Sequence, residues 1–322
     1  MYFNQNNNFY HGIMFHHFHD NGIHTKGQGS IDKDDFYKMI NFIGRNNILN
    51  ADVFYEKFKN NNLKDNEVCL SFDDAIKCQI DIALPVLEEL KIKSFFFVYT
   101  SLFEGKPDNL EFFRYFRMNY FKSVDEFYDN FYKVLDKDLK SFFEKNSIKI
   151  KETKIKFPLY SVSDIKFRLV RDVFLTKVQY EDTMFSMFKE KQFNHNEYSK
   201  KLFFQKNDLQ TLDNLGHIVG LHSHNHPTLL EKLSYDEQKS EYENCLSSIS
   251  DILDKPKNEI KCMSHPCGSY NADTLEILKE LGIELGFKQI MSIEPEKGMK
   301  KINNSFLEIA RQDHADIFKR MN

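Results

Sequence analysis

Short apolar runs alternate with amphipathic stretches at both ends of this 322-residue chain. The apolar runs are typical of buried strands, and the stretches between them show the period of a helix. Expected strands cover residues 10–18, 67–72, 93–99, 217–221, 260–263, 284–287 and 306–309. Expected helices cover residues 34–45, 51–58, 80–90, 124–135, 165–178, 208–215, 234–253, 271–282 and 315–320. Strands and helices that alternate at this spacing form βαβ units, so the pattern predicts an α/β fold with a parallel sheet.

The alternation stops between residues 104 and 207. Phe, Tyr, Lys and Asp recur there at helical spacing, and no glycine follows Gly105 until the segment ends. We therefore expect three parts. Residues 1–103 form the first part of the α/β domain, and residues 208–322 form its second part. Residues 104–207 form a helical insertion, which serves as a lid or as a surface for a homo-oligomer.

Charge and composition exclude some classes of function. The formal net charge is −4 with both signs interspersed, so no basic stripe for a nucleic acid exists. No apolar run reaches about 18 residues, so we expect no membrane-spanning helix. The first eight residues are polar and do not resemble a secretory signal, and the five cysteines show no paired metal-ligand spacing. These features favour a cytoplasmic protein with reduced thiols.

Two polar clusters follow expected strands. Asp73 and Asp74 come directly after the strand at 67–72, and His222, His224 and His226 follow the strand at 217–221. Active sites of parallel α/β sheets and barrels lie at this edge, where the strands end. Each cluster taken alone has an alternative explanation without function. The histidines could belong to a polar loop that happens to be rich in histidine, and the aspartates could be an ordinary acidic pair in a turn.

Taken together, the clusters offer a metal site. Asp74, His222 and His226 give one carboxylate and two imidazoles, a set that binds a divalent cation and leaves positions for water and substrate. Zinc is the default, and Co²⁺, Ni²⁺, Mn²⁺ or Fe²⁺ are alternatives. Asp73 stays free to act as a general base. Non-haem iron oxygenases also use two histidines and one carboxylate, but the alternating α/β pattern argues against their double-sheet barrel.

Three motifs resemble those of the polysaccharide deacetylases, carbohydrate esterase family 4. The sequence SFDDA at 71–75 resembles their TFDDG motif, and HSHNHP at 222–227 resembles their His-Ser/Thr-x-x-His-Pro motif. SHPCGSYN at 264–271 is similar to a variant of the third motif. The resemblance implies a distorted (β/α)7 barrel with Asp74, His222 and His226 as metal ligands and Asp73 as base. It also implies that the backbone N–H of Cys267 helps to hold the oxyanion.

The resemblance leaves the general acid open. Met14-Phe15-His16 resembles the Met-Tyr-His of family members with a circularly permuted barrel, which favours His16 as the acid. His17 is the next candidate, and His314, in a poor match to a late Leu-x-His motif, is the third. The third motif departs from the family pattern in two places. Ser264 stands where many members carry an arginine that orients the base, and Cys267 replaces an aromatic residue of the sugar pocket.

The resemblance implies a metal-dependent hydrolase that removes an N-acetyl or related acyl group from a carbohydrate. The substrate would be an amino sugar or a precursor of a surface polysaccharide, which suits a cytoplasmic location. A hydrolase of another C–N bond, as in the allantoinase-like branch of the superfamily, is one alternative. A non-catalytic carbohydrate-binding relative is another, because the third motif is altered.

Overall fold

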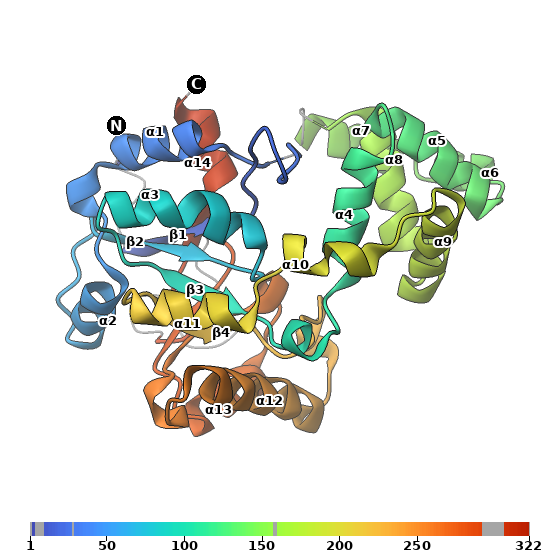
Figure 1. Ribbon diagram of the computed structural model, residues 1–322. Coiled ribbons are helices and arrows are strands. Elements are labelled where there is room, and N and C mark those ends of the chain that lie inside the picture. The colour runs from blue at the N-terminus through green and yellow to red at the C-terminus, as the bar shows by residue number, and fades with distance from the viewer. Residues whose placement is uncertain (1, 4–9, 28, 157–159, 292–305, 322) are drawn as a thin grey trace. The chain divides into compact units, whose positions relative to one another are not determined.

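The computed structural model describes residues 2–3, 10–27, 29–156, 160–291 and 306–321 (Figure 1). The polar start of the chain, on which the absence of a secretory signal was argued, lies mostly outside these ranges. The chain divides into two compact units. The barrel unit comprises Met1–Asp108 and Lys200–Asn322, and the helical unit comprises Asn109–Ser199.

Parallel strands form the centre of the barrel unit. Within the described residues they are β1 (His11–Phe15), β2 (Val68–Phe72), β3 (Phe95–Val98), β4 (Ile218–Leu221), β5 (Cys262–Ser264), β6 (Leu285–Phe287) and β7 (Arg311–Asp313). Their order in the sheet is β6-β5-β4-β3-β2-β1-β7. Ile309 forms a parallel bridge with Phe287 of β6, while the next residue, Ala310, accepts a hydrogen bond from Gly12 of β1. The segment that ends in β7 therefore brings the two edges together, and the predicted distorted (β/α)7 barrel is confirmed.

Helices surround these strands (Figure 1). They are α1 (Lys33–Ile43), α2 (Ala51–Lys59), α3 (Leu84–Glu89), α11 (Lys206–Asn214), α12 (Tyr235–Leu253), α13 (Ala272–Glu280) and α14 (His314–Met321). Several begin at N-caps that are recognisable in the sequence. Ser234 and Glu237 form a capping box at α12, and Asn271 caps α13. In the part of the chain that the structure describes, no helix has both the length and the hydropathy to cross a membrane.

The helical unit contains α4 (Asn109–Asn119), α5 (Val124–Leu135), α6 (Lys140–Lys145), α7 (Ser147–Lys156), α8 (Val162–Leu169) and α9 (Lys177–Glu190), and α10 (Ser199–Leu202) follows at its end. The single helix expected over 165–178 is wrong. Leu175 is extended, and Thr176 forms a capping box with Gln179 that starts α9. A capped break of this kind is invisible to hydrophobic periodicity, because the apolar spacing continues across it.

Two other elements differ from expectation. The helix expected over 80–90 begins as a π-helical turn at Gln79–Ala83, and α3 follows it with Pro85 in its first turn. The last strand was expected at 306–309 but lies at Arg311–Asp313, with an isolated bridge at Ile309. A buried arginine in this strand hid it from a search for apolar runs.

Phenylalanine side chains fill much of the barrel core. The rings of Phe72 and Phe96 stack with centroids 4.7 Å apart, and Phe95 lies 5.3 Å from Phe287. At Gly220 in β4 the backbone approaches β5 so closely that a Cβ would lie 2.4 Å from the carbonyl oxygen of Cys262. Only glycine fits there, and β4 leads directly to His222.

Candidate active site

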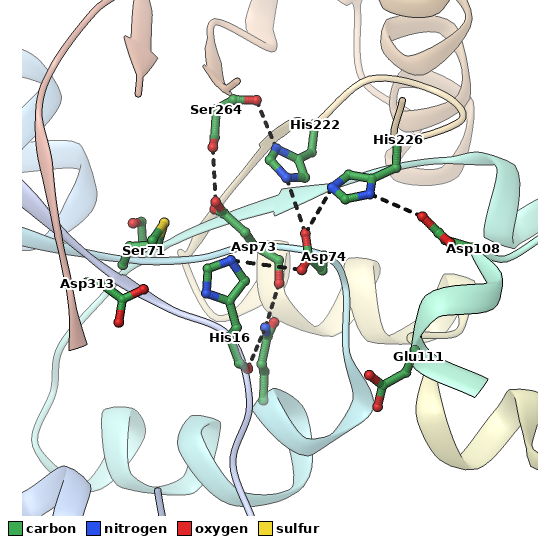
Figure 2. A network of polar contacts seen from close by, with 12 residues as sticks. His16, Ser71, Asp73, Asp74, Asp108, Glu111, His222, His226, Ser264 and Asp313 are labelled. Carbon is green, nitrogen blue, oxygen red and sulfur yellow. Dashed lines mark hydrogen bonds and ion pairs between the residues drawn. The ribbon is translucent and has the colours of Figure 1, made fainter. Parts of the chain in front are cut away.

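The structure brings the three predicted metal ligands together at the ends of β2 and β4 (Figure 2). The Nε2 atoms of His222 and His226 lie 3.2 and 3.3 Å from the same oxygen, Oδ1 of Asp74. Two ligand atoms on a tetrahedral zinc, each about 2.1 Å from the ion, are about 3.4 Å apart. The spacing of the three side chains therefore fits a divalent cation.

Hydrogen bonds to the far side of each imidazole support the same fit. Nδ1 of His222 lies 2.8 Å from the carbonyl oxygen of Ser264, which can only accept. Nδ1 of His226 lies 3.4 Å from Oδ2 of Asp108. Both Nδ1 atoms therefore carry the hydrogen, which leaves each Nε2 directed at Asp74 as a metal ligand needs. The partner carboxylate Asp108 was not predicted, because an isolated aspartate in a loop carries no signal.

The charges of the triad are coupled. Burial opposes ionisation of Asp74, but the charge of His226 and hydrogen bonds from both histidines outweigh it and hold its pKa well below the usual range. Burial likewise opposes protonation of His226, yet the charge of Asp74 raises its pKa well above the usual value. Asp74 and His226 therefore stabilise each other's charged forms. A cation at this position would compete with the proton on His226.

Asp73, the predicted base, is 2% exposed and lies in a network of hydrogen bonds. Arg311 donates from Nη1 to its Oδ1 at 2.7 Å and from Nη2 to its Oδ2 at 2.6 Å. Ser264 donates to Oδ2 at 3.1 Å and accepts a hydrogen bond from Nη2 of Arg311 at 2.7 Å. Burial opposes the ionisation of Asp73, but the Arg311 guanidinium outweighs it and lowers the pKa, so the base is a carboxylate at neutral pH.

Arg311 is the residue that the sequence interpretation missed. Ser264 stands where many members of the resembled family carry an arginine, but here Arg311 of β7 lies beside Asp73, and Ser264 hydrogen-bonds to both side chains. Arg311 is 1% exposed and is held further by the carbonyl oxygen of Lys288 and by the hydroxyl of Ser71. An arginine directly after the apolar run at 306–310 was the available signal, because a buried guanidinium requires a carboxylate partner.

Of the three candidate acids, His16 lies beside the triad. Its Nε2 is 3.9 Å from Oδ2 of Asp74 (Figure 2), and it also groups with Asp313 and His314. His314 is buried, and its two ring nitrogens lie 3.3 and 2.7 Å from the backbone carbonyl oxygens of Met14 and Gly29. Its ring is therefore held by the backbone of the barrel. His17 is half-buried one residue after His16.

The third motif forms a tight turn near the triad. Cys267 is exposed and has a φ of 52°, in the left-handed region. Desolvation raises the pKa of its thiol, and the charge of nearby His226 opposes this shift. His265 is buried, stacks on Tyr270 and directs Nε2 to the carbonyl oxygen of Leu307 at 2.8 Å. His265 is thus a core residue, while Arg311 occupies the position beside the base.

Backbone strain is concentrated in the three motif loops. Among the described residues, ten that are not glycine have a positive φ, and half of these lie in the motifs. They are Asp74, Ala75, Ser223, His226 and Cys267. Each such residue costs about 1–2 kcal/mol, and strain of this kind persists only where the surroundings enforce it. The local conformations are consistent with a site built for function.

Comparison with known proteins finds similarity to deacetylases. The family model described as polysaccharide deacetylase matches residues 173–286, which include His222, His226 and the third motif. No curated protein sequence matches the chain. The Streptococcus pyogenes deacetylase PplD, in complex with acetate, has a similar fold, with a TM-score of 0.55 at 16% identity over 94% of this chain and 90% of that chain.

Two further structures share the fold. A de-N-acetylase from Aggregatibacter actinomycetemcomitans has a TM-score of 0.53 at 12% identity, over 97% of this chain and 99% of that chain. IcaB from Ammonifex degensii has a TM-score of 0.51 at 11% identity, over 94% and 91%. These structures show the fold of the chain, a (β/α)7 barrel, and residues 173–286 resemble the polysaccharide deacetylase family.

Proposed function

We propose that this chain is a metal-dependent hydrolase that removes an N-acetyl or related acyl group from an amino sugar. The observation that carries the proposal is the meeting of Asp74, His222 and His226 beside a separate carboxylate, Asp73, that an arginine keeps ionised. Metal-assisted amide hydrolysis uses a cation site, a base and an acid that lie close together. The two carboxylates, adjacent in sequence, have different surroundings and can take different roles.

Asp74, His222 and His226 would hold the cation, with zinc as the first candidate. When bound, a divalent cation supplies Lewis acidity, which lowers the pKa of water and polarises a carbonyl group. Asp73 would take the proton from the attacking water, and Arg311 would keep its carboxylate oriented for that step. The backbone N–H of Cys267 would donate a hydrogen bond to the oxyanion of the tetrahedral intermediate.

His16 would complete the reaction as the general acid. The C–N bond breaks only when the leaving nitrogen is protonated, and His16, at the end of β1, lies next to Asp74 without being part of the triad. Its carbonyl oxygen accepts a hydrogen bond from Gln79 at 3.0 Å, and Gln79 also donates to the carbonyl oxygen of Asp73 at 2.6 Å. One buried side chain thereby ties the backbone of the proposed acid to that of the proposed base.

The substrate we propose is a carbohydrate, and a precursor of a surface polysaccharide in particular. Cys267 stands at the position of the aromatic residue that the family resemblance assigns to the sugar pocket, so the sugar contacts differ from the common pattern. A cytoplasmic location, which we infer from the reduced cysteines, would favour a nucleotide-linked, lipid-linked or free amino sugar over a finished polymer.

The test is acetate release from a panel of N-acetyl sugars by the protein stripped of metal and reloaded with Zn²⁺ or Co²⁺. We expect release from at least one amino sugar, and we expect Asp73→Asn to keep its metal and to lose turnover. His222→Ala should lose both. Opening of a ureide ring, which releases no acetate, would move the activity to the allantoinase-like branch. A metal-loaded protein that hydrolyses no substrate in either assay would contradict the proposal.

A further inference from the structure

We propose that Glu241 of α12 is a positioning residue that holds the loop between His222 and His226 in the conformation that binds the cation. This inference rests on the proposed function, because it concerns the same metal site. Glu241 lies outside the three motifs and makes no contact with substrate in the mechanism above. Its carboxylate acts through the backbone of the loop.

The loop has a conformation that it cannot keep by itself. Ser223 has a φ of 66° and His226 a φ of 55°, so two residues in the left-handed region enclose His224 and Asn225. The side chains at the two ends, His222 and His226, must nevertheless meet at one oxygen of Asp74. Any relaxation of the backbone between them would move the two imidazoles apart.

Glu241 binds the middle of this loop. Its Oε2 accepts hydrogen bonds from the backbone N–H of His224 at 3.0 Å and of Asn225 at 2.8 Å. Its Oε1 accepts a third from the side-chain amide of Asn225 at 2.7 Å. Two successive backbone N–H groups that converge on one anion form a nest, and here the anion is a carboxylate of the chain itself. Glu241 is 9% exposed, so these bonds form largely away from water.

The opposite side of the loop is held as well. The N–H groups of Thr100 and Ser101 donate to the carbonyl oxygen of His224 at 3.2 and 2.9 Å. The hydroxyl of Ser223 accepts a hydrogen bond from the N–H of His226 at 3.1 Å. His224, the middle of the three histidines, contacts Thr100 through Nδ1 at 2.8 Å and so belongs to this clamp. The loop lies between β3 and α12, and Glu241 is the residue of α12 that binds the middle of the loop.

Removal of Glu241 should therefore weaken metal binding without unfolding the barrel. Partners that orient metal ligands from outside the coordination shell typically change metal affinity 10–100-fold when they are mutated. We expect a loss in this range for Glu241→Ala. Glu241→Gln keeps one acceptor oxygen for the two backbone N–H groups, and the amide of Asn225 can turn to face it, so its loss should be only a few-fold. Glu243→Ala, at an exposed position of the same helix, is the matched control and should match the parent.

The experiment measures Zn²⁺ affinity of the four proteins by competition with a chromogenic chelator, with and without added formate. Formate is a carboxylate small enough to occupy the emptied nest, so it should restore part of the affinity of Glu241→Ala and leave the parent and Glu243→Ala unchanged. If Glu241 only stabilised the fold, formate would not restore the Zn²⁺ affinity of Glu241→Ala. Affinity of Glu241→Ala within threefold of the parent, or a loss that formate does not reduce, would overturn the inference.

A second readout separates this inference from the proposed function. Amide hydrogen exchange of His224 and Asn225 in the metal-free protein reports the nest directly, and Glu241→Ala should accelerate it at least tenfold relative to Glu243→Ala. Unchanged exchange would overturn the role of Glu241 even if the protein is an active deacetylase. A third outcome is faster exchange in the variant while the parent protein binds no Zn²⁺. That result would support the loop contact and refute the metal-dependent function.

Discussion

Replacing Arg311 with methionine tests whether this arginine is the counter-charge of the proposed base. Asp73 and Arg311 are 2% and 1% exposed and share two hydrogen bonds of 2.7 and 2.6 Å. Breaking a buried pair by removing one partner costs about 3–5 kcal/mol, because a charge is left in the interior without compensation. We expect Arg311→Met to lower the free energy of unfolding by an amount in this range.

A double-mutant cycle isolates the interaction. Asp73→Asn alone leaves the guanidinium unpaired and should cost a similar amount, whereas the double variant removes both charges and should cost little more than either single change. We therefore expect a coupling energy of about 3 kcal/mol. Urea unfolding followed by far-UV circular dichroism provides the four free energies.

The helical unit offers a control for this cycle. Arg171 and Asp172 also form two hydrogen bonds, but the Asp172 side chain is 53% exposed, so Arg171→Met should cost less than about 1 kcal/mol. Additive effects of Arg311→Met and Asp73→Asn, within about 0.5 kcal/mol, would refute the assignment of Arg311 as the counter-charge.

Four further changes have defined outcomes. Asp108→Asn should weaken Zn²⁺ binding about 10–100-fold in a chelator competition, and unchanged affinity would exclude it as an orienting partner. His16→Gln should keep its metal and lower kcat about 10²–10⁴-fold, and a parental rate would exclude it as the acid. Burial lowers the pKa of His265 from 6.5 to about 3, so its neutral form stabilises the fold above pH 6.5 and this stability is lost as the pH falls toward 3. His265→Gln should remove a slope of about 1.4 kcal/mol per pH unit in that window, as acid unfolding curves would reveal, and an unchanged slope would contradict the assignment. Gly220→Ala should destabilise the barrel by about 1–3 kcal/mol in urea, because its Cβ would overlap β5, and parental stability would contradict that contact.

The sequence pattern indicated a parallel α/β sheet and the edge that holds the site, for reasons that are local, whereas the barrel was an implication of the family resemblance. Apolar runs end at Phe72 and Leu221, and the polar residues after them have no role in a core, so they were recognisable as candidates. Parallel strands place such ends at one edge of the sheet, which is why residues about 150 positions apart could be grouped. The structure then brings Asp74, His222 and His226 together, while their roles stay proposals.

Other parts of the site depend on contacts that no local pattern encodes. Arg311 reaches Asp73 only because the barrel closes between β6 and β1, and Asp108 reaches His226 from a loop without any motif. Glu241 looks like an ordinary polar position of an amphipathic helix until the loop after β4 is placed against it. Pairings of this kind become visible only when tertiary structure sets which side chains share a buried space.

Anomalous diffraction at the zinc absorption edge, from crystals of the protein grown with Zn²⁺, tests the central claim most directly. We predict one strong peak bounded by the Asp74 carboxylate and the Nε2 atoms of His222 and His226, and its loss in His222→Ala. A peak at another place, or zinc-loaded crystals with no peak between these three side chains, would contradict the assignment.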